Sequence, residues 1–388
     1  MNRRFFLLAL AIVCALPCAA RPRPEPRVVD LTAPDGAKLK ATYYAAGKPG
    51  PGVMLFHQCD HDRKMWNDLA PRLAASGFNV LALDFRGFGE SSGTSALTLP
   101  PQEGRRQVTE VWPGDVDTAF AYLAAQPGVK KDVIGAAGAS CGVNQSIQLA
   151  RRHPEVKSLV LLSGSTDREG RHFLRRSPQL PIFASAADDD EGVVEVLRWI
   201  VGSSRNPGNR FQHYQSGGHG IEMFAPHPEL TAMIINWFDT TLRKTPGRAP
   251  ASQGNISRGS NILDTIDEPG GAAKAAEMLA EARQRDPQTN LFSEAVVNMV
   301  GYQHLRTGDT AGAIEIFKLN ATAFPTSPNA CDSLADAYLA AGQRELAIEN
   351  AEKALRLLES DTTDSEGRRK QIRESVEQKL KQLKSPGE

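Results

Sequence analysis

The sequence predicts an α/β fold, with a mostly parallel sheet covered by helices on both faces, followed by an all-α domain of helical repeats. Three observations predict this arrangement. Short apolar runs alternate with helical patterns between residues 28 and 242. Residues 245–262 are rich in Pro, Gly, Ser and Asn, which is typical of a linker. The sequence beyond them is helical and similar to itself at a fixed spacing.

The composition fits globular domains. Apolar residues make up 41% of the 388 residues, which is enough for a sizeable core. The 45 Lys and Arg residues balance the 45 Asp and Glu residues, so no net charge favours nucleic acid or an anionic membrane surface. We therefore expect no nucleic-acid partner.

Residues 1–20 have the layout of a secretory signal peptide. A basic start at residues 2–4 precedes an apolar run at residues 5–16, and small residues lead to Arg21. The run is shorter than the ~20 residues that a membrane-spanning helix needs. We expect an exported protein, periplasmic or secreted, with no stable membrane span once the signal is removed; an uncleaved N-terminal anchor is the alternative. Residues 21–26 read as a Pro-rich spacer.

The α/β domain is expected over residues 27–244. Strands at residues 28–32 and 38–44 would form a hairpin around the Asp35-Gly36 turn. Further buried strands are expected at residues 52–57, 78–84, 132–137, 156–162, 180–186 and 209–214. Helices are expected at residues 66–76, 113–126, 141–153, 168–175, 191–201 and 228–242. Buried strands separated by helices indicate a parallel sheet.

The second domain has a 34-residue period. Leu305, Gly308, Ala313, Ile314 and Glu315 recur as Leu339, Gly342, Ala347, Ile348 and Glu349. This pattern resembles tetratricopeptide repeats, which we expect over residues 269–358 after a linker at 245–268. A charged helical tail is expected over residues 359–388. The resemblance implies a surface for a protein partner, and a generic helical bundle with chance identities is the alternative.

A glycine-flanked serine lies between an expected strand and an expected helix. The segment Gly138-Ala139-Ser140-Cys141-Gly142 fits the pattern G-x-S-x-G of a nucleophile elbow. A sharp turn there exposes the serine hydroxyl, and glycines on both sides allow the backbone to approach its neighbours closely. We expect Ser140 to be a catalytic nucleophile; a tight turn without chemistry is the alternative.

A serine at its ordinary pKa is a poor nucleophile and needs a base. His219 lies in Gly217-Gly218-His219-Gly220, after the last expected strand and before the last helix. A loop of this kind can turn the ring towards the elbow. His227 is the nearest rival, but it belongs to the start of the closing helix. We therefore expect His219 to be the base.

The base needs a carboxylate that orients it and stabilises the imidazolium. Three aspartates follow the strand expected at residues 180–186. Asp188 is the expected acid because it lies nearest to the strand end, and Asp189 is the alternative. These carboxylates also suit a solvated helix start, where the helix dipole favours negative charge.

Residues 27–243 resemble the α/β-hydrolase superfamily, and most of all its dienelactone-hydrolase-like branch. The chain order Ser140, Asp188, His219 is the order of that superfamily. Residues 84–91, Asp-Phe-Arg-Gly-Phe-Gly-Glu-Ser, resemble its D-x-R-G-x-G-x-S turn, and Leu55-Phe56-His57 ends a strand where it usually has His-Gly. Residues 113–116 start the helix before the elbow strand.

The resemblance implies an oxyanion hole made by the backbone N–H groups of Cys141 and Cys59. Gln58 is the alternative to Cys59, because it stands where the family usually has glycine. Dienelactone hydrolases carry cysteine at the elbow, so Cys141 is an alternative nucleophile. We expect Cys59 and Cys141 to lie close together and leave open whether they form a disulfide.

No cofactor or metal is expected. The loop residues His57, Cys59, Asp60, His61 and Asp62 have the chemistry of metal ligands. They follow one another too closely along one loop to form a tetrahedral set.

The sequence therefore predicts a serine hydrolase that acts on a small ester, lactone or other acyl substrate through an acyl-enzyme. Residues 163–179 leave no room for a large cap domain between two strands, so we expect an open site. Two alternatives remain: a catalytically inactive hydrolase-like fold that serves as a binding scaffold, and a serine peptidase of similar fold.

Overall fold

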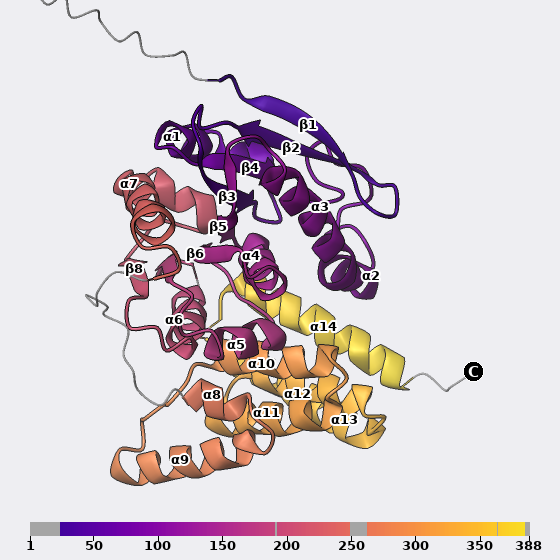
Figure 1. Ribbon diagram of the computed structural model, residues 1–388. Helices are drawn as coiled ribbons and strands as arrows, with labels where there is room; N and C mark the ends of the chain where they lie inside the picture. The colour runs from indigo at the N-terminus through magenta and orange to yellow at the C-terminus, as the bar shows by residue number, and fades with distance from the viewer. Residues whose placement is uncertain (1–23, 191, 249–261, 363, 385–388) are drawn as a thin grey trace, which may run out of the picture.

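The computed structural model describes residues 24–190, 192–248, 262–362 and 364–384, and these form an α/β domain followed by a helical domain (Figure 1). The expected signal peptide lies outside the described residues, as does most of the expected Pro-rich spacer. No helix in the described part of the chain is both long and apolar enough to cross a membrane.

The described strands of the first domain form one sheet in the order β1-β2-β4-β3-β5-β6-β7-β8. β2 is antiparallel to β1 and β4, whereas neighbouring strands from β4 to β8 are parallel. The carboxyl ends of the parallel strands therefore share one edge of the sheet. The strands are β1 (Arg27–Thr32), β2 (Lys38–Tyr44), β3 (Gly50–Phe56), β4 (Asn79–Leu83), β5 (Val129–Ala139), β6 (Val156–Leu162), β7 (Ile182–Ala187) and β8 (Arg210–Tyr214).

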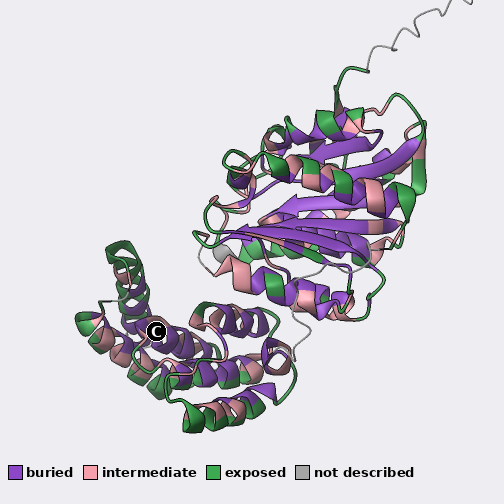
Figure 2. Cartoon of the chain, turned by 90° about the vertical axis from the view of Figure 1, so that its left-hand side faces the viewer, coloured by how far each residue is buried: buried purple, intermediate pink, exposed green. Residues whose placement is uncertain are grey.

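Helices cover both faces of the sheet, and alternate residues of each strand enter different cores. In β4, Leu81 belongs to the core cluster that also contains residues of α3, α4, α5 and α6, whereas Val80 belongs to the cluster that contains residues of α1 and α7. Figure 2 shows the buried strands between helices whose outer sides are exposed. The helices are α1 (Leu69–Ala75), α2 (Pro101–Arg106), α3 (Trp112–Ala124), α4 (Cys141–Arg152), α5 (Arg168–Arg175), α6 (Val193–Ser203) and α7 (Glu229–Phe238).

Three elements of this domain differ from the sequence prediction. The helix expected at residues 66–76 is a 3₁₀ turn, Arg63–Trp66, followed by α1. The sequence does not predict α2. β5 begins at Val129 rather than at residue 132. The prediction started too late because the charged residues at the start of β5 are exposed, and only its second half has the apolar pattern of a buried strand.

The second domain consists of α8 (Ile262–Ile266), α9 (Gly271–Arg285), α10 (Glu294–Arg306), α11 (Thr310–Ala323), α12 (Pro328–Ala340), α13 (Arg344–Ser360) and α14 (Glu366–Lys384). The hairpin of α10 and α11 is followed by the hairpin of α12 and α13. Ser293 and Ser327, 34 positions apart, each cap the first helix of a hairpin. Gly308 and Gly342 connect the helices at φ 83° and 71°, a conformation that favours glycine. α8 lies within the stretch that the sequence predicts as linker.

The helical domain packs against α5 and α6 of the α/β domain (Figure 1). Arg171 of α5 and Asp267, which follows α8, are both fully buried, with Nη2 and Oδ1 2.5 Å apart. Gln303 of α10 accepts a hydrogen bond from Arg171 and donates one of 3.1 Å to the Thr166 carbonyl. Trp199 of α6 donates a hydrogen bond of 2.8 Å to Asp264. These buried polar contacts fix α10 beside the carboxyl edge of the sheet.

Candidate active site

The serine of the predicted elbow lies between the end of β5 and the start of α4. Ser140 has φ 51° and ψ −114°, a strained conformation that is rare for a residue with a side chain. A Cβ on Gly138 would lie 2.0 Å from the carbonyl oxygen of Gly142, and one on Gly142 would lie 2.4 Å from that of Phe56. Only glycine fits at these two positions, so the turn depends on both.

The base predicted from the sequence follows β8. The Nδ1 atom of His219 lies 2.8 Å from Oδ2 of Asp190, whose side chain is 13% exposed. Asp190 raises the pKa of His219, through this hydrogen bond and its negative charge, and this outweighs the effect of burial. The loop is also fixed by the backbone N–H of His219, which donates a hydrogen bond of 3.0 Å to Glu222.

The structure places neither Asp188 nor Asp189 against the histidine, contrary to the sequence prediction. The backbone N–H of Asp188 extends the pairing of β7 with β8, and its carboxylate bonds to His213 at 2.7 Å. Asp189 accepts hydrogen bonds from the N–H groups of Gly217 and Gly218, at distances of 3.0–3.1 Å. β7 continues to Ala187, one residue beyond the prediction, so the following turn directs Asp190 towards the histidine loop.

Ser140 and His219 line the same cleft. No hydrogen bond joins their side chains in the described part of the chain, and Oγ of Ser140 lies 4.0 Å from Sγ of Cys141. Hydrogen bonds between catalytic groups are often long without substrate and shorten when it binds. The arrangement therefore places the Ser140 hydroxyl and the oriented imidazole of His219 on one cleft.

Cys59 and Cys141 form a disulfide, with their Cα atoms 5.7 Å apart. The bond joins the loop after β3 to the first residue of α4. Cys141 therefore has no free thiol in this structure, which argues against its role as the nucleophile. Among the described residues, the free cysteine is Cys331, buried in the helical domain.

Two buried side chains hold the loop after β3. His57 has its Nδ1 2.6 Å from the carbonyl oxygen of Gln58, and its Nε2 accepts a hydrogen bond of 3.0 Å from the N–H of Phe85. Burial lowers the pKa of His57, so its ring is neutral and carries its proton on Nδ1. The amide oxygen of Gln58 accepts a hydrogen bond of 3.0 Å from the N–H of Ile221. Gln58 therefore connects this loop to the histidine loop, a role that the sequence did not reveal.

Buried and charged contacts hold the turn after β4 in place. Asp84 is fully buried, pairs with Arg63 and accepts a hydrogen bond of 2.9 Å from the N–H of Glu90. The Nε and Nη2 atoms of Arg86 donate hydrogen bonds of 3.0 and 2.7 Å to the two carboxylate oxygens of Asp115. The two segments that supported the resemblance, residues 84–91 and 113–116, therefore meet through the contact of Arg86 with Asp115.

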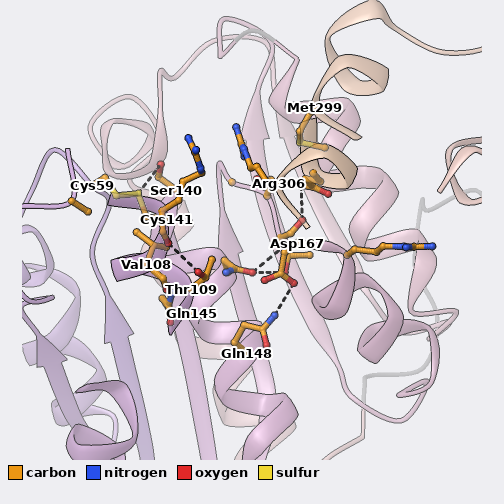
Figure 3. A pocket seen from close by; sticks show the side chains of 18 of the residues that line it. Cys59, Val108, Thr109, Ser140, Cys141, Gln145, Gln148, Asp167, Met299 and Arg306 are labelled. Atoms are coloured by element: carbon orange, nitrogen blue, oxygen red, sulfur yellow. Dashed lines mark hydrogen bonds between the residues drawn. A yellow bond between two sulfur atoms is a disulfide. The ribbon is translucent and has the colours of Figure 1, made fainter. Parts of the chain in front are cut away.

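The cleft has a volume of about 1340 Å³ and lies between the two domains. Figure 3 shows Cys59, Ser140 and Cys141 on one side of it, and Met299 and Arg306 of α10 on the other. Residues of α2 also line it. The sequence predicted an open site and gave no sign that α2 and α10 would contribute walls. No group of three or more His, Cys, Asp or Glu residues in the described ranges could hold a metal ion.

A sequence family matches part of the α/β domain. Residues 51–188 match a sequence family described as "alpha/beta hydrolase fold". Two Mycobacterium tuberculosis proteins, from the strains CDC 1551 / Oshkosh and ATCC 25618 / H37Rv, are each 30% identical over 153 residues, or 39% of this chain. The matched region spans about half the length of these relatives, 50% in each case, and both are described as uncharacterized.

Three solved structures are similar to the α/β domain. An esterase of Pyrococcus furiosus has a TM-score of 0.46 at 18% identity, covering 56% of this chain and 91% of its own. A thioesterase domain from the curacin biosynthetic pathway has 0.43 at 14%, covering 55% and 100%. An acylaminoacyl peptidase of Pyrococcus horikoshii has 0.46 at 13%, covering 58% and 43%. The family match over residues 51–188 and the strand order described above indicate an α/β-hydrolase fold for the first domain.

Proposed function

We propose that the protein is a serine hydrolase that transfers an acyl group from its substrate to Ser140 and then to water. The observation that carries the proposal is the strained elbow of Ser140, which opens into the same cleft as His219 with its partner Asp190. A nucleophile, a base and an orienting acid are the groups that acyl transfer requires. The acid of this proposal is Asp190, in place of Asp188.

In the first half-reaction, Nε2 of His219 takes the proton of the Ser140 hydroxyl as Oγ attacks the carbonyl carbon. Asp190 favours the tautomer with the proton on Nδ1, which leaves the Nε2 lone pair free, and it stabilises the imidazolium that forms. The tetrahedral intermediate collapses, and the leaving group departs with the proton from His219. Water, activated by the same histidine, then hydrolyses the acyl-enzyme.

Two backbone N–H groups are proposed to stabilise the oxyanion. Cys141 is the first residue of α4, where N–H groups have no partner inside the helix, and no described residue accepts its hydrogen bond. No described residue accepts a hydrogen bond from the backbone N–H of Cys59 either. The N–H of Gln58 is instead directed at Sδ of Met65, 3.4 Å away, which favours Cys59 over Gln58 as the second donor. One such donor contributes about 3 kcal/mol to the transition state.

A fluorophosphonate probe tests the proposal directly. The wild-type protein should be labelled at Ser140, and Ser140→Ala should remain unlabelled while keeping its circular dichroism spectrum. A panel of acyl esters should be hydrolysed by the wild type only. Equal labelling of both proteins, or a wild type that neither labels nor hydrolyses any ester, would overturn the enzymatic function and leave a binding scaffold. Turnover of blocked peptides but not of esters would make the protein a peptidase.

The proposed repeats, location and branch of the superfamily rest on observations other than the active site. The 34-residue offset, the two serine caps and the two left-handed glycines support tetratricopeptide-like repeats that bind a protein partner. The disulfide supports an oxidising, exported location, because such bonds are rare in the cytosol. The dienelactone-hydrolase-like assignment rests on the motifs of the sequence, and turnover of lactones in the ester panel tests it.

A further inference from the structure

The cleft beside Ser140 has two arginines on walls from different domains. Arg105 is on α2, and Arg306 is the last residue of α10. Neither guanidinium forms a hydrogen bond or ion pair with any residue that the structure describes. Both stay positively charged at neutral pH.

The other arginines that line the cleft already have hydrogen-bond or ion-pair partners. Each has a carboxylate or a carbonyl oxygen within its reach. The contacts are Arg106 with Glu110 at 2.8 Å, Arg151 with Glu169 at 3.0 Å, Arg152 with Asp117 at 2.8 Å, and Arg168 with the carbonyl of Asp267 at 3.1 Å. These four are therefore poorly available to a ligand, in contrast to Arg105 and Arg306.

The acidic residues of the cleft are occupied as well. Glu110 and Glu169 pair with the arginines named above. Asp167 caps α5 by accepting a 2.8 Å hydrogen bond from the N–H of Gly170, and it accepts another of 2.8 Å from the side chain of Gln148. No described carboxylate of the cleft remains to neutralise Arg105 and Arg306.

The positive charges of the two free guanidinium groups repel each other. Desolvation, and next to it the positive charge of Arg105, lower the pKa of Arg306. Two like charges without an anion between them are unfavourable, and an anionic ligand would relieve that repulsion. A guanidinium pair is also well suited to the planar geometry of a carboxylate or to the oxygens of a phosphate.

The rest of the cleft suits the body of such a ligand. Its volume of about 1340 Å³ exceeds that of a typical small-molecule site, roughly 300–1,000 Å³. Apolar side chains from both domains line it: Val108, Val193, Val196, Met299 and Leu305. The space therefore accepts a chain longer than that of a minimal ester.

We infer that the substrate is an acyl ester with an apolar body and an anionic group remote from the reacting carbonyl, bound by Arg105 and Arg306. This inference rests on the proposed function and names the substrate class of the same site. The anionic group is a carboxylate or a phosphate, which share this chemistry. The chemical step is unchanged: the ester bond is hydrolysed through Ser140, and the anionic group takes no part in it.

The test compares matched esters of one chain length whose far end carries a methyl group, a carboxylate or a phosphate. Wild type should prefer an anionic ester in kcat/KM, through a lower KM. Arg105→Gln and Arg306→Gln should each lower the ratio of anionic to neutral turnover about fivefold, and the double variant about twentyfold. Added salt should reduce the preference. Lys130→Gln removes an exposed positive charge outside the cleft and should leave the ratio unchanged.

A charge-reversal variant distinguishes a changed substrate preference from a loss of folding. Arg105→Glu/Arg306→Glu should favour an ester that ends in a quaternary ammonium over the anionic one, which a misfolded variant cannot do. The inference is overturned if the double Gln variant keeps the wild-type ratio within twofold, or if the reversed variant shows no new preference. Hydrolysis of the neutral ester that disappears in Ser140→Ala reports separately on the proposed function. The stronger of the carboxylate and phosphate responses identifies the anionic group.

Discussion

Asp190 holds His219 through a 2.8 Å hydrogen bond to Nδ1, while its neighbours Asp188 and Asp189 bond elsewhere, to His213 and to the glycine loop. Three consecutive carboxylates thus have three different partners, and this allows a direct comparison. Asp190→Asn should lower kcat by about 10³–10⁴-fold, because the amide favours the wrong tautomer of the ring.

Asp188→Asn is the matched control for this substitution. Its carboxylate is 54% exposed and contacts His213 outside the proposed triad, so its kcat should stay within a few fold of wild type. Steady-state kinetics on one ester, with circular dichroism of each variant, makes the comparison. A larger loss in Asp188→Asn than in Asp190→Asn would return the acid role to Asp188.

The pH profile should report the same hydrogen bond. Asp190 raises the pKa of His219 above its ordinary 6.5, and only the neutral ring acts as a base. Activity should therefore rise with pH through an inflection above 6.5 in the wild type. In Asp190→Asn that inflection should move to lower pH, because the raising influence is lost. Profiles of kcat/KM between pH 5 and 9 measure this, and an unmoved inflection would contradict the assignment.

The disulfide should affect both rate and stability, since it joins the two segments that carry the proposed oxyanion donors. Cys59→Ser/Cys141→Ser should lose about 2–4 kcal/mol of unfolding free energy and at least tenfold in kcat. Chemical denaturation and ester kinetics measure these effects. Mass spectrometry of the unreduced, alkylated wild type should show no label on either residue; two labelled thiols there would refute the pairing.

Asp267 should be the most sensitive residue between the domains. Burial alone would raise the pKa of Asp267. Two neighbours outweigh burial and hold that pKa below its ordinary 3.8: His304, whose Nε2 lies 3.5 Å from Oδ1 of Asp267, and Arg171. Its stabilising effect is therefore complete above about pH 4 and is lost as the pH falls through the lowered folded-state pKa.

Asp267→Asn should accordingly cost about 3–5 kcal/mol at neutral pH, because it leaves Arg171 buried without its counter-charge. Glu268→Gln, beside it, is the control. Glu268 is 53% exposed and pairs with Arg175, so the loss there should stay below about 1 kcal/mol. Urea denaturation measures both variants, and equal losses would show that burial of Asp267 is not decisive.

The sequence predicted the parts of the site that depend on local pattern. Ser140 is a candidate because the elbow needs glycine at fixed positions, and His219 is one because its loop is marked by glycines on both sides. Asp190 was missed because the choice among three aspartates depends on where β7 ends, and strand ends are uncertain by more than the single residue that mattered.

Other parts of the site have no local signal at all. The role of Gln58 depends on a contact with Ile221 across 163 positions of the chain. The contribution of α10 to the cleft depends on how two domains pack, which the buried contact between Arg171 and Asp267 determines. The sequence did not predict α2, because its short run of polar residues has no apolar periodicity.

Because α10 lines the cleft, the two domains would contribute differently to the proposed reaction. The residues proposed to cleave the bond, Ser140 and His219, belong to the α/β domain, whereas Met299 and Arg306 on one wall of the cleft belong to α10 of the helical domain. For the proposed hydrolase, substitutions on the cleft side of α10 would therefore change which substrate is bound and leave the residues of the proposed reaction in place.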